Sequence, residues 1–165
     1  MVNYENIRFR HSLQSSSSQP RKSIVLIKRS KKRWFKNHDS IHDSLKILAE
    51  HYNLTLEVFS DKNLPSLNET VKMFNRAIIV VAPHSAGNSN LVFSEPGTVL
   101  VEGLCQNPVH CYIQMARNIG LRYHGIIFPD SKKTCLNFTV SDILPSVCKA
   151  VHMFRKNHTK SELCE

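Results

Sequence analysis

The stretch Ala77-Ile-Ile-Val-Val-Ala82, followed by Pro83-His84-Ser85-Ala86-Gly87, decides the fold. A continuous run of apolar, mostly β-branched residues is typical of a strand buried on both faces of a parallel sheet. The run ends at a proline, and the small residues after it suit a tight loop leading into a helix. This stretch therefore predicts the central strand of an α/β domain, with a loop at its carboxyl end.

Outward from that strand, apolar runs of strand type alternate with segments of helical periodicity. Asp39 or Ser40 is the expected cap of the first helix, and Ser66 with Glu69 forms a capping box for the second. The order predicts a Rossmann-like parallel sheet with helices on both faces over residues 23–156, between polar tails at 1–22 and 157–165. Strands are expected at 23–27, 54–59, 77–82, 98–101 and 123–128, and helices at 39–52, from 66, at 90–93, 109–119 and 142–154.

The chain of 165 residues has a formal net charge of +9 and a sequence pI of about 9.5. This balance favours anionic partners, although a solvated basic surface explains it equally well. A basic nucleic-acid-binding domain is an alternative that rests on charge alone, since no zinc-finger spacing or RNP-type aromatic motif accompanies it. No apolar run approaches a membrane span of about 20 residues. The first ten residues do not resemble a signal peptide, so a targeting segment is expected outside this chain.

The five cysteines form no CxxC pair and predict no zinc site. One or two disulfides are possible, and their pairing stays open. Four Asn-x-Ser/Thr sequons favour a lumenal or extracellular protein. They are candidate glycosylation sites at Asn53, Asn68, Asn137 and Asn157.

Candidate ligand-binding residues follow three of the predicted strands. The loop 83–90 offers small residues and a helix N-terminus to an anion, and an ordinary turn is the alternative. Arg29 and Arg33 follow the first strand and suit a phosphate, or they are solvated charges. Glu102 ends the fourth strand, where it can accept hydrogen bonds from ribose hydroxyls, or it is a surface acid. Because ligands bind at the carboxyl ends of parallel strands, we expect these groups to converge.

His84 is the candidate catalytic residue, as a base or as a donor to a developing charge. A structural role is the alternative for a single loop histidine. The loop matches neither the dinucleotide fingerprint nor the P-loop. The chain has no Asp-x-Asp pair, so a carboxylate-held Mg²⁺ or Mn²⁺ is not indicated.

The run Arg76–Phe93, with Pro96-Gly-Thr-Val-Leu-Val-Glu102 after it, resembles the C-terminal signature of glycosyltransferase family 61. The segment Tyr112–Tyr123 and the strand leading into Lys28-Arg29 also fit that family, so the resemblance covers about residues 23–128. The family includes an EGF-domain-specific O-GlcNAc transferase, an O-mannose-linked β-1,4-GlcNAc transferase, and plant xylosyl- and arabinosyltransferases.

The resemblance implies an inverting, metal-independent transferase without a cofactor, acting in the endoplasmic reticulum or Golgi lumen. Its GT-B architecture has two Rossmann-like lobes, and this chain resembles the C-terminal lobe that holds the nucleotide-sugar. It implies that Arg29 contacts the diphosphate, that loop 83–87 backs the donor, and that Glu102 holds the nucleoside. Donor-binding residues are then expected to be Arg29, Arg33, His84, Ser85, Ala86, Gly87, Asn90 and Glu102.

Two departures from the family pattern bear on activity. Ser85 replaces the family's glycine, which would strain the loop if that position needs a positive φ. The chain also holds one lobe, so an N-terminal lobe is expected as a partner, together with a UDP-sugar such as UDP-GlcNAc and a protein or glycan acceptor. A truncated module without catalytic activity is the alternative.

Overall fold

The computed structural model describes residues 20–31, 33–104, 110–127, 138–154 and 164. Within them a five-stranded sheet has the strand order β2-β1-β3-β4-β5, and every neighbouring pair of strands is parallel. The predicted fold class is confirmed. The strands are β1 (Ser23–Lys28), β2 (Thr55–Ser60), β3 (Ala77–Pro83), β4 (Val99–Leu104) and β5 (Arg122–Ile127).

β3 is the middle strand, as its composition predicts, and all seven of its residues are buried. Its side chains alternate between two hydrophobic clusters, one on each face of the sheet. Ile79 and Val81 belong to the cluster under α2 and α5, whereas Val80 and Ala82 belong to the cluster under α3, η1 and α4. A strand that is apolar on both faces therefore has a covering layer on each side.

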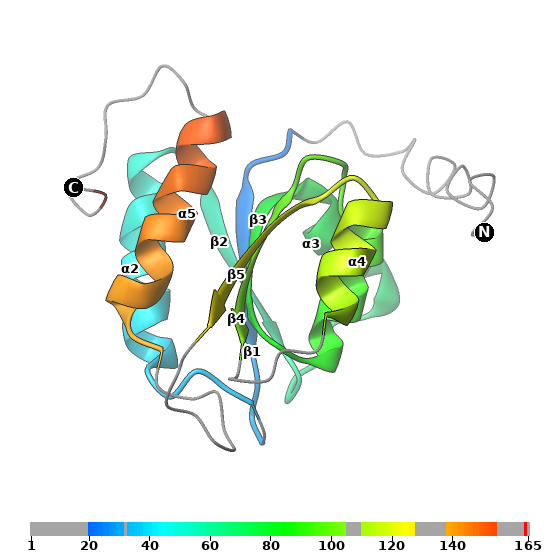
Figure 1. Ribbon diagram of the computed structural model, residues 1–165, viewed down its shortest axis with the longest axis horizontal. Helices are drawn as coiled ribbons and strands as arrows, with labels where there is room; N and C mark the ends of the chain where they lie inside the picture. The colour runs from blue at the N-terminus through cyan, green and yellow to red at the C-terminus, as the bar shows by residue number, and fades with distance from the viewer. Residues whose placement is uncertain (1–19, 32, 105–109, 128–137, 155–163, 165) are drawn as a thin grey trace.

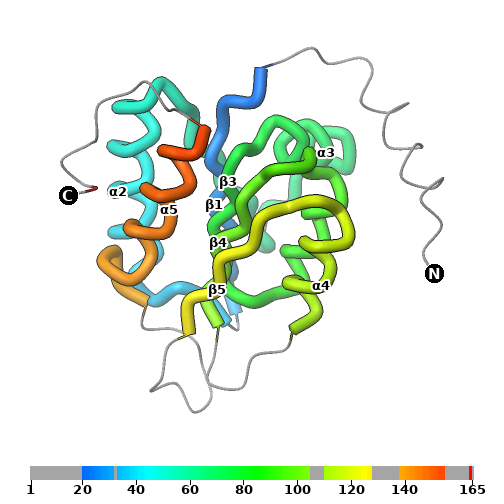
Figure 2. The backbone as a smooth tube through the Cα atoms, turned by 45° about the horizontal axis from the view of Figure 1, so that its top comes forward, coloured from blue at the N-terminus to red at the C-terminus, as the bar shows by residue number. Residues whose placement is uncertain are grey.

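Helices cover both faces of the sheet (Figures 1 and 2). α2 and α5 lie together on one face, and α3 and α4 lie on the other with the 3₁₀ helix η1. No helix in the described part of the chain is long and apolar enough to cross a membrane. The elements are α2 (His38–His51), α3 (Leu67–Arg76), η1 (Ala86–Phe93), α4 (Cys111–Asn118) and α5 (Val140–Phe154).

Of the two predicted helix N-caps, one is confirmed and one is wrong. The capping box of α3 is confirmed, because the Glu69 amide donates to Ser66 Oγ while the Glu69 carboxylate accepts from the Ser66 amide. The expected cap of α2 is wrong. Its N-cap is Asn37, which makes no side-chain cap bond, and Asp39 lies inside the first turn, 3.6 Å from Lys28 Nζ. The Asp39 carboxylate pairs with Lys28 and, at 3.2 Å, with Nδ1 of His38.

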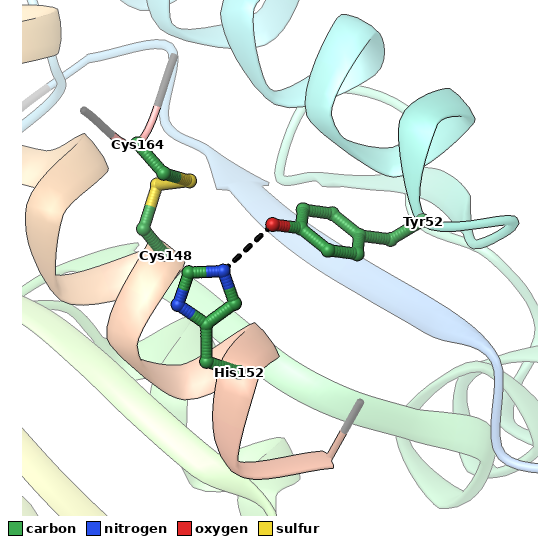
Figure 3. Close-up of a disulfide and its surroundings, with 4 residues drawn as sticks. All are labelled: Tyr52, Cys148, His152 and Cys164. Atoms are coloured by element: carbon green, nitrogen blue, oxygen red, sulfur yellow. Dashed lines mark hydrogen bonds between the residues drawn. A yellow bond between two sulfur atoms is a disulfide. The ribbon is translucent and has the colours of Figure 1, made fainter. Parts of the chain in front are cut away.

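Two contacts near the C-terminus link α5 to other parts of the chain (Figure 3). Cys148 of α5 forms a disulfide with Cys164, which resolves one pairing that the sequence leaves open. Tyr52 Oη, just after α2, lies 2.7 Å from Nε2 of His152 on α5. The chain after α5 is thereby fastened to the helix that precedes it.

Candidate functional site

The strand order places a topological switch point between β1 and β3. From the carboxyl end of β1 the chain leads to α2 on one face, and from β3 it leads to η1 on the other. Open parallel sheets bind ligands in the crevice outside such a point. The loops 29–37 and 84–85 flank it, and they carry Arg29, Arg33 and His84.

Gly87 shows how closely the second loop approaches β1. A Cβ added at Gly87 would lie 3.2 Å from Ile27 Cγ2, a separation that leaves little room for any side chain. The glycine thus lets the first turn of η1 pack over the end of β1. Asn90 holds this turn, since its Nδ2 donates to the Gly87 carbonyl at 3.1 Å.

His84 and Glu102 form a buried pair at the end of β3 and β4. His84 Nδ1 lies 2.8 Å from Glu102 Oε1, and the Glu102 side chain is 0% exposed. Because an ionised carboxylate only accepts hydrogen bonds, the proton of this bond lies on Nδ1, and in the neutral imidazole the lone pair then lies on Nε2. The His84 amide also donates to the Gly103 carbonyl at 2.9 Å, which fixes the loop against β4. The ring of Tyr112 lies 5.2 Å from the imidazole, centroid to centroid.

Two further groups donate to the Glu102 carboxylate. Asn88 Nδ2 donates to Oε1 at 3.0 Å, and Tyr123 Oη donates to Oε2 at 2.7 Å. Burial and the hydrogen bond to Glu102 raise the pKa of Tyr123 above its ordinary value, so this phenol stays protonated. We call His84, Asn88, Glu102 and Tyr123 the His84 cluster.

The expected position and exposure of Glu102 are wrong. It lies within β4, two residues before the strand ends, and it is buried rather than on the surface. The side-chain alternation of β4 sends Leu100, and hence Glu102, to the face of η1 and α4. The buried carboxylate therefore orients the side chains of His84, Asn88 and Tyr123. Its role in holding a nucleoside remains a prediction.

Ser85 adopts an extended conformation with φ −159° and ψ 163°. The position has no positive φ, so the condition under which Ser85 would strain the loop is not met. The side chain is buried, and its hydroxyl donates to Asn88 Oδ1 at 3.4 Å. Serine at this position is compatible with the loop and joins it to the His84 cluster.

The two arginines lie on the other loop. Arg29 Nε is 3.3 Å from Asp61 Oδ2, and Asp61 Oδ1 accepts from the Ser30 amide at 2.8 Å. Asp61 follows β2, so the end of that strand holds the start of loop 29–37. Arg33 is exposed and has φ 52°, a left-handed conformation that is unusual for arginine. Within the described residues, no hydrogen bond or ion pair joins either arginine to the His84 cluster.

Comparison with known proteins identifies the family of this chain. The family model described as Glycosyltransferase 61 matches residues 1–101. The chain belongs to glycosyltransferase family 61. No curated protein matches the sequence. The matched range contains β1, β2, β3 and the start of β4, and with them Arg29 and the loop that carries His84. The likeness of residues 102–128 to the family stays a prediction, as does the relation to the EGF-domain-specific O-GlcNAc transferase.

The candidate site also contains residues that the sequence did not single out. Asn88, Tyr123 and Asp61 all hold a selected residue in place. Strand pairing was the missing signal for Tyr123, because the register sets Glu102 opposite Gly125. A Cβ at Gly125 would lie 3.0 Å from the Tyr123 hydroxyl, so the glycine admits this side chain toward the carboxylate.

A pocket that no sequence pattern indicated lies on the opposite face of the sheet, the face covered by α2 and α5. It lies between the first turns of α2 and α5 and has a volume of about 620 Å³. Its lining comes from two segments about 100 positions apart, so no local pattern indicates it. The described lining residues are Asn37, Ser40, Thr139, Val140, Ser141, Leu144 and Pro145.

Proposed function

We propose that this chain is the donor-binding lobe of a family 61 glycosyltransferase that transfers a sugar such as GlcNAc or xylose from a UDP-sugar. The observation that carries the proposal is the position of Arg29 and His84 on the two loops that flank the switch point of the sheet. A nucleotide-sugar needs a cation for its diphosphate and a polar group near its anomeric carbon. The two loops supply one of each.

Arg29 is suited to the diphosphate. Its ion pair with Asp61 restrains the guanidinium, which lowers the entropy that binding must remove. A planar guanidinium can donate two parallel hydrogen bonds to phosphate oxygens. In the proposed reaction this charge stabilises the departing UDP, so the transfer proceeds without a metal ion.

His84 is suited to act as the base. The carboxylate of Glu102 holds Nδ1–H, so Nε2 can take the proton of the acceptor hydroxyl. The acceptor oxygen then forms a bond to the anomeric carbon while the bond from that carbon to the UDP oxygen breaks. Attack from the side opposite UDP inverts the anomeric centre, as expected for this family.

The acceptor site requires a second lobe, which we propose faces the carboxyl edge of the sheet. Two large apolar side chains are exposed at this edge. Trp34, after β1, is 41% exposed, and Ile127, at the end of β5, is 55% exposed. In the proposed enzyme these side chains become buried against the second lobe.

We also propose that the protein works in the lumen of the endoplasmic reticulum or Golgi. The Cys148–Cys164 disulfide supports this, because disulfides persist in oxidising compartments. Asn53 and Asn68 of the sequons are exposed and reachable for glycosylation. Asn137 and Asn157 lie outside the described residues.

Calorimetric titration with UDP and UDP-GlcNAc tests the proposal. We expect both ligands to bind the chain. With the second lobe supplied, the variant His84→Gln should keep donor affinity and lose transfer to an acceptor. Absence of binding by the chain, both alone and joined to a second lobe, would refute the proposed function.

A further inference from the structure

The pocket between α2 and α5 belongs to the same edge of the sheet as the proposed donor site. α2 follows β1, and Lys28 at the end of β1 lies 3.6 Å from Asp39, next to Ser40 of the pocket lining. On the other wall, Asn37 Nδ2 donates to the Phe138 carbonyl at 3.2 Å, directly before Thr139. The pocket is thus fixed beside the carboxyl end of β1.

The chemistry of the pocket is neutral. None of its described lining residues is charged, and they combine hydroxyl and amide groups with apolar surface. Val140, Leu144 and Pro145 provide an apolar wall, while Asn37 Oδ1 can accept a hydrogen bond from a ligand and the Ser40 hydroxyl can donate or accept one. A volume of about 620 Å³ lies within the usual range for small-molecule sites, roughly 300–1,000 Å³.

We infer that this pocket binds the uncharged nucleoside end of the donor, its base and ribose. The inference rests on the proposed function. In the proposed function the charged diphosphate binds Arg29. The sugar lies next to His84, on the face of the sheet opposite to the pocket. The nucleoside is the remaining neutral part, and the pocket is a neutral site next to the end of β1.

This assignment gives the donor a direction across the edge of the sheet. Its nucleoside lies on the side of α2 and α5, its diphosphate crosses the ends of β1 and β3, and its sugar points to the side of η1 and α4 (Figure 2). It also replaces Glu102 as the holder of the nucleoside. That carboxylate is fully buried and already accepts hydrogen bonds from His84, Asn88 and Tyr123.

A pair of matched variants on α2 tests the inference. Ser40 lines the pocket and Lys46 does not, and both side chains are exposed on the same helix. A tyrosine at position 40 fills the pocket, so Ser40→Tyr should weaken UDP binding to the full chain by at least about tenfold, which is about 1.4 kcal/mol. Lys46→Tyr should leave the affinity for UDP within about twofold. Pyrophosphate, which lacks the nucleoside, should bind both variants equally.

The outcomes separate this inference from the proposed function. If wild-type protein binds UDP and both tyrosine variants bind it equally, the pocket assignment is wrong and the donor site stands. If wild-type protein binds neither UDP nor pyrophosphate, both alone and joined to a second lobe, the proposed function itself fails. NMR on the unmodified chain gives a second readout in case Ser40→Tyr does not fold. Uridine should shift the amide signals of residues 37–40 and 139–141, and shifts confined to other residues would overturn the inference.

Discussion

The Asp61 carboxylate holds the Arg29 guanidinium in place. The contribution of Arg29 to UDP binding can be measured by mutation. Because hydrogen bonds between charged groups are worth about 1.5–3 kcal/mol each, Arg29→Ala should reduce UDP affinity by roughly ten- to hundredfold. Calorimetry measures the change. Arg117→Ala removes the same charge from the exposed surface of α4 and should have little effect. Equal losses in the two variants would show that UDP responds only to net charge.

His38 couples the stability of the fold to pH. Burial lowers its pKa from the ordinary value of 6.5, and its Nε2 is buried without a hydrogen-bond partner. The unfolded chain takes up a proton below pH 6.5 that the folded chain resists, so stability is full above that pH and falls as pH drops through the lowered pKa. Because a single proton is involved, the loss cannot exceed about 1.4 kcal/mol per pH unit.

Urea unfolding at pH 7 and pH 5 measures this term. His38→Gln should flatten the dependence on pH, because glutamine does not titrate. His124→Gln changes an exposed histidine of β5 and should retain the wild-type slope. A slope that survives in His38→Gln would assign the acid sensitivity to other groups.

At the scale of elements, β4 depends on Gly103. A Cβ at this position would lie 2.8 Å from the Phe35 ring and 2.9 Å from the Phe138 ring, and both rings are buried. These rings meet edge to face with centroids 5.5 Å apart, and they join loop 29–37 to the start of α5. Gly103→Ala should therefore cost about 1–3 kcal/mol of unfolding free energy through overpacking.

A double variant distinguishes overpacking from a change in the strand itself. In Gly103→Ala/Phe35→Leu the smaller side chain relieves the contact, so the combined loss should be less than the sum of the two single losses. Denaturant unfolding of all three proteins measures the coupling. Strict additivity would mean that the alanine acts on β4 alone and not through the aromatic pair.

Local sequence patterns predicted the helices and strands well where the stabilising interactions lie between residues close in sequence. The apolar run of β3 and the Ser66 capping box depend on adjacent residues, and both are confirmed. The expected cap of α2 was wrong because the helix begins at His38, which places Asp39 inside the first turn beside His38 and Lys28. The strand containing Glu102 was set too short, since a carboxylate inside a buried strand is stable only with the donors that Tyr123 and Asn88 bring to it.

The whole molecule shows why the site was only partly predictable. Its loops follow from topology, because any parallel sheet brings the ends of its strands to one edge. Which side chains meet there depends on register and on helix packing. The register sets Gly125 beside Glu102, and the packing of α2 on α5 creates the pocket. The sequence therefore indicated the edge of the sheet where a ligand site is expected, but not which side chains would form it.

At the scale of the whole molecule, the last prediction concerns the disulfide that links Cys164, near the C-terminus, to α5. Cys148 is buried in α5, and its disulfide to Cys164 closes a loop with a sequence separation of 16. A cross-link of this span stabilises by about 2–4 kcal/mol, chiefly by restricting the unfolded chain. Cys164→Ser should lose this amount in denaturant unfolding, and dithiothreitol should bring the wild type down to the same level. Cys111→Ser changes an exposed free thiol and should match the wild type. If Cys164→Ser and the oxidised wild type unfold at the same denaturant concentration, the bond does not support the fold, and the argument for an oxidising compartment loses its basis.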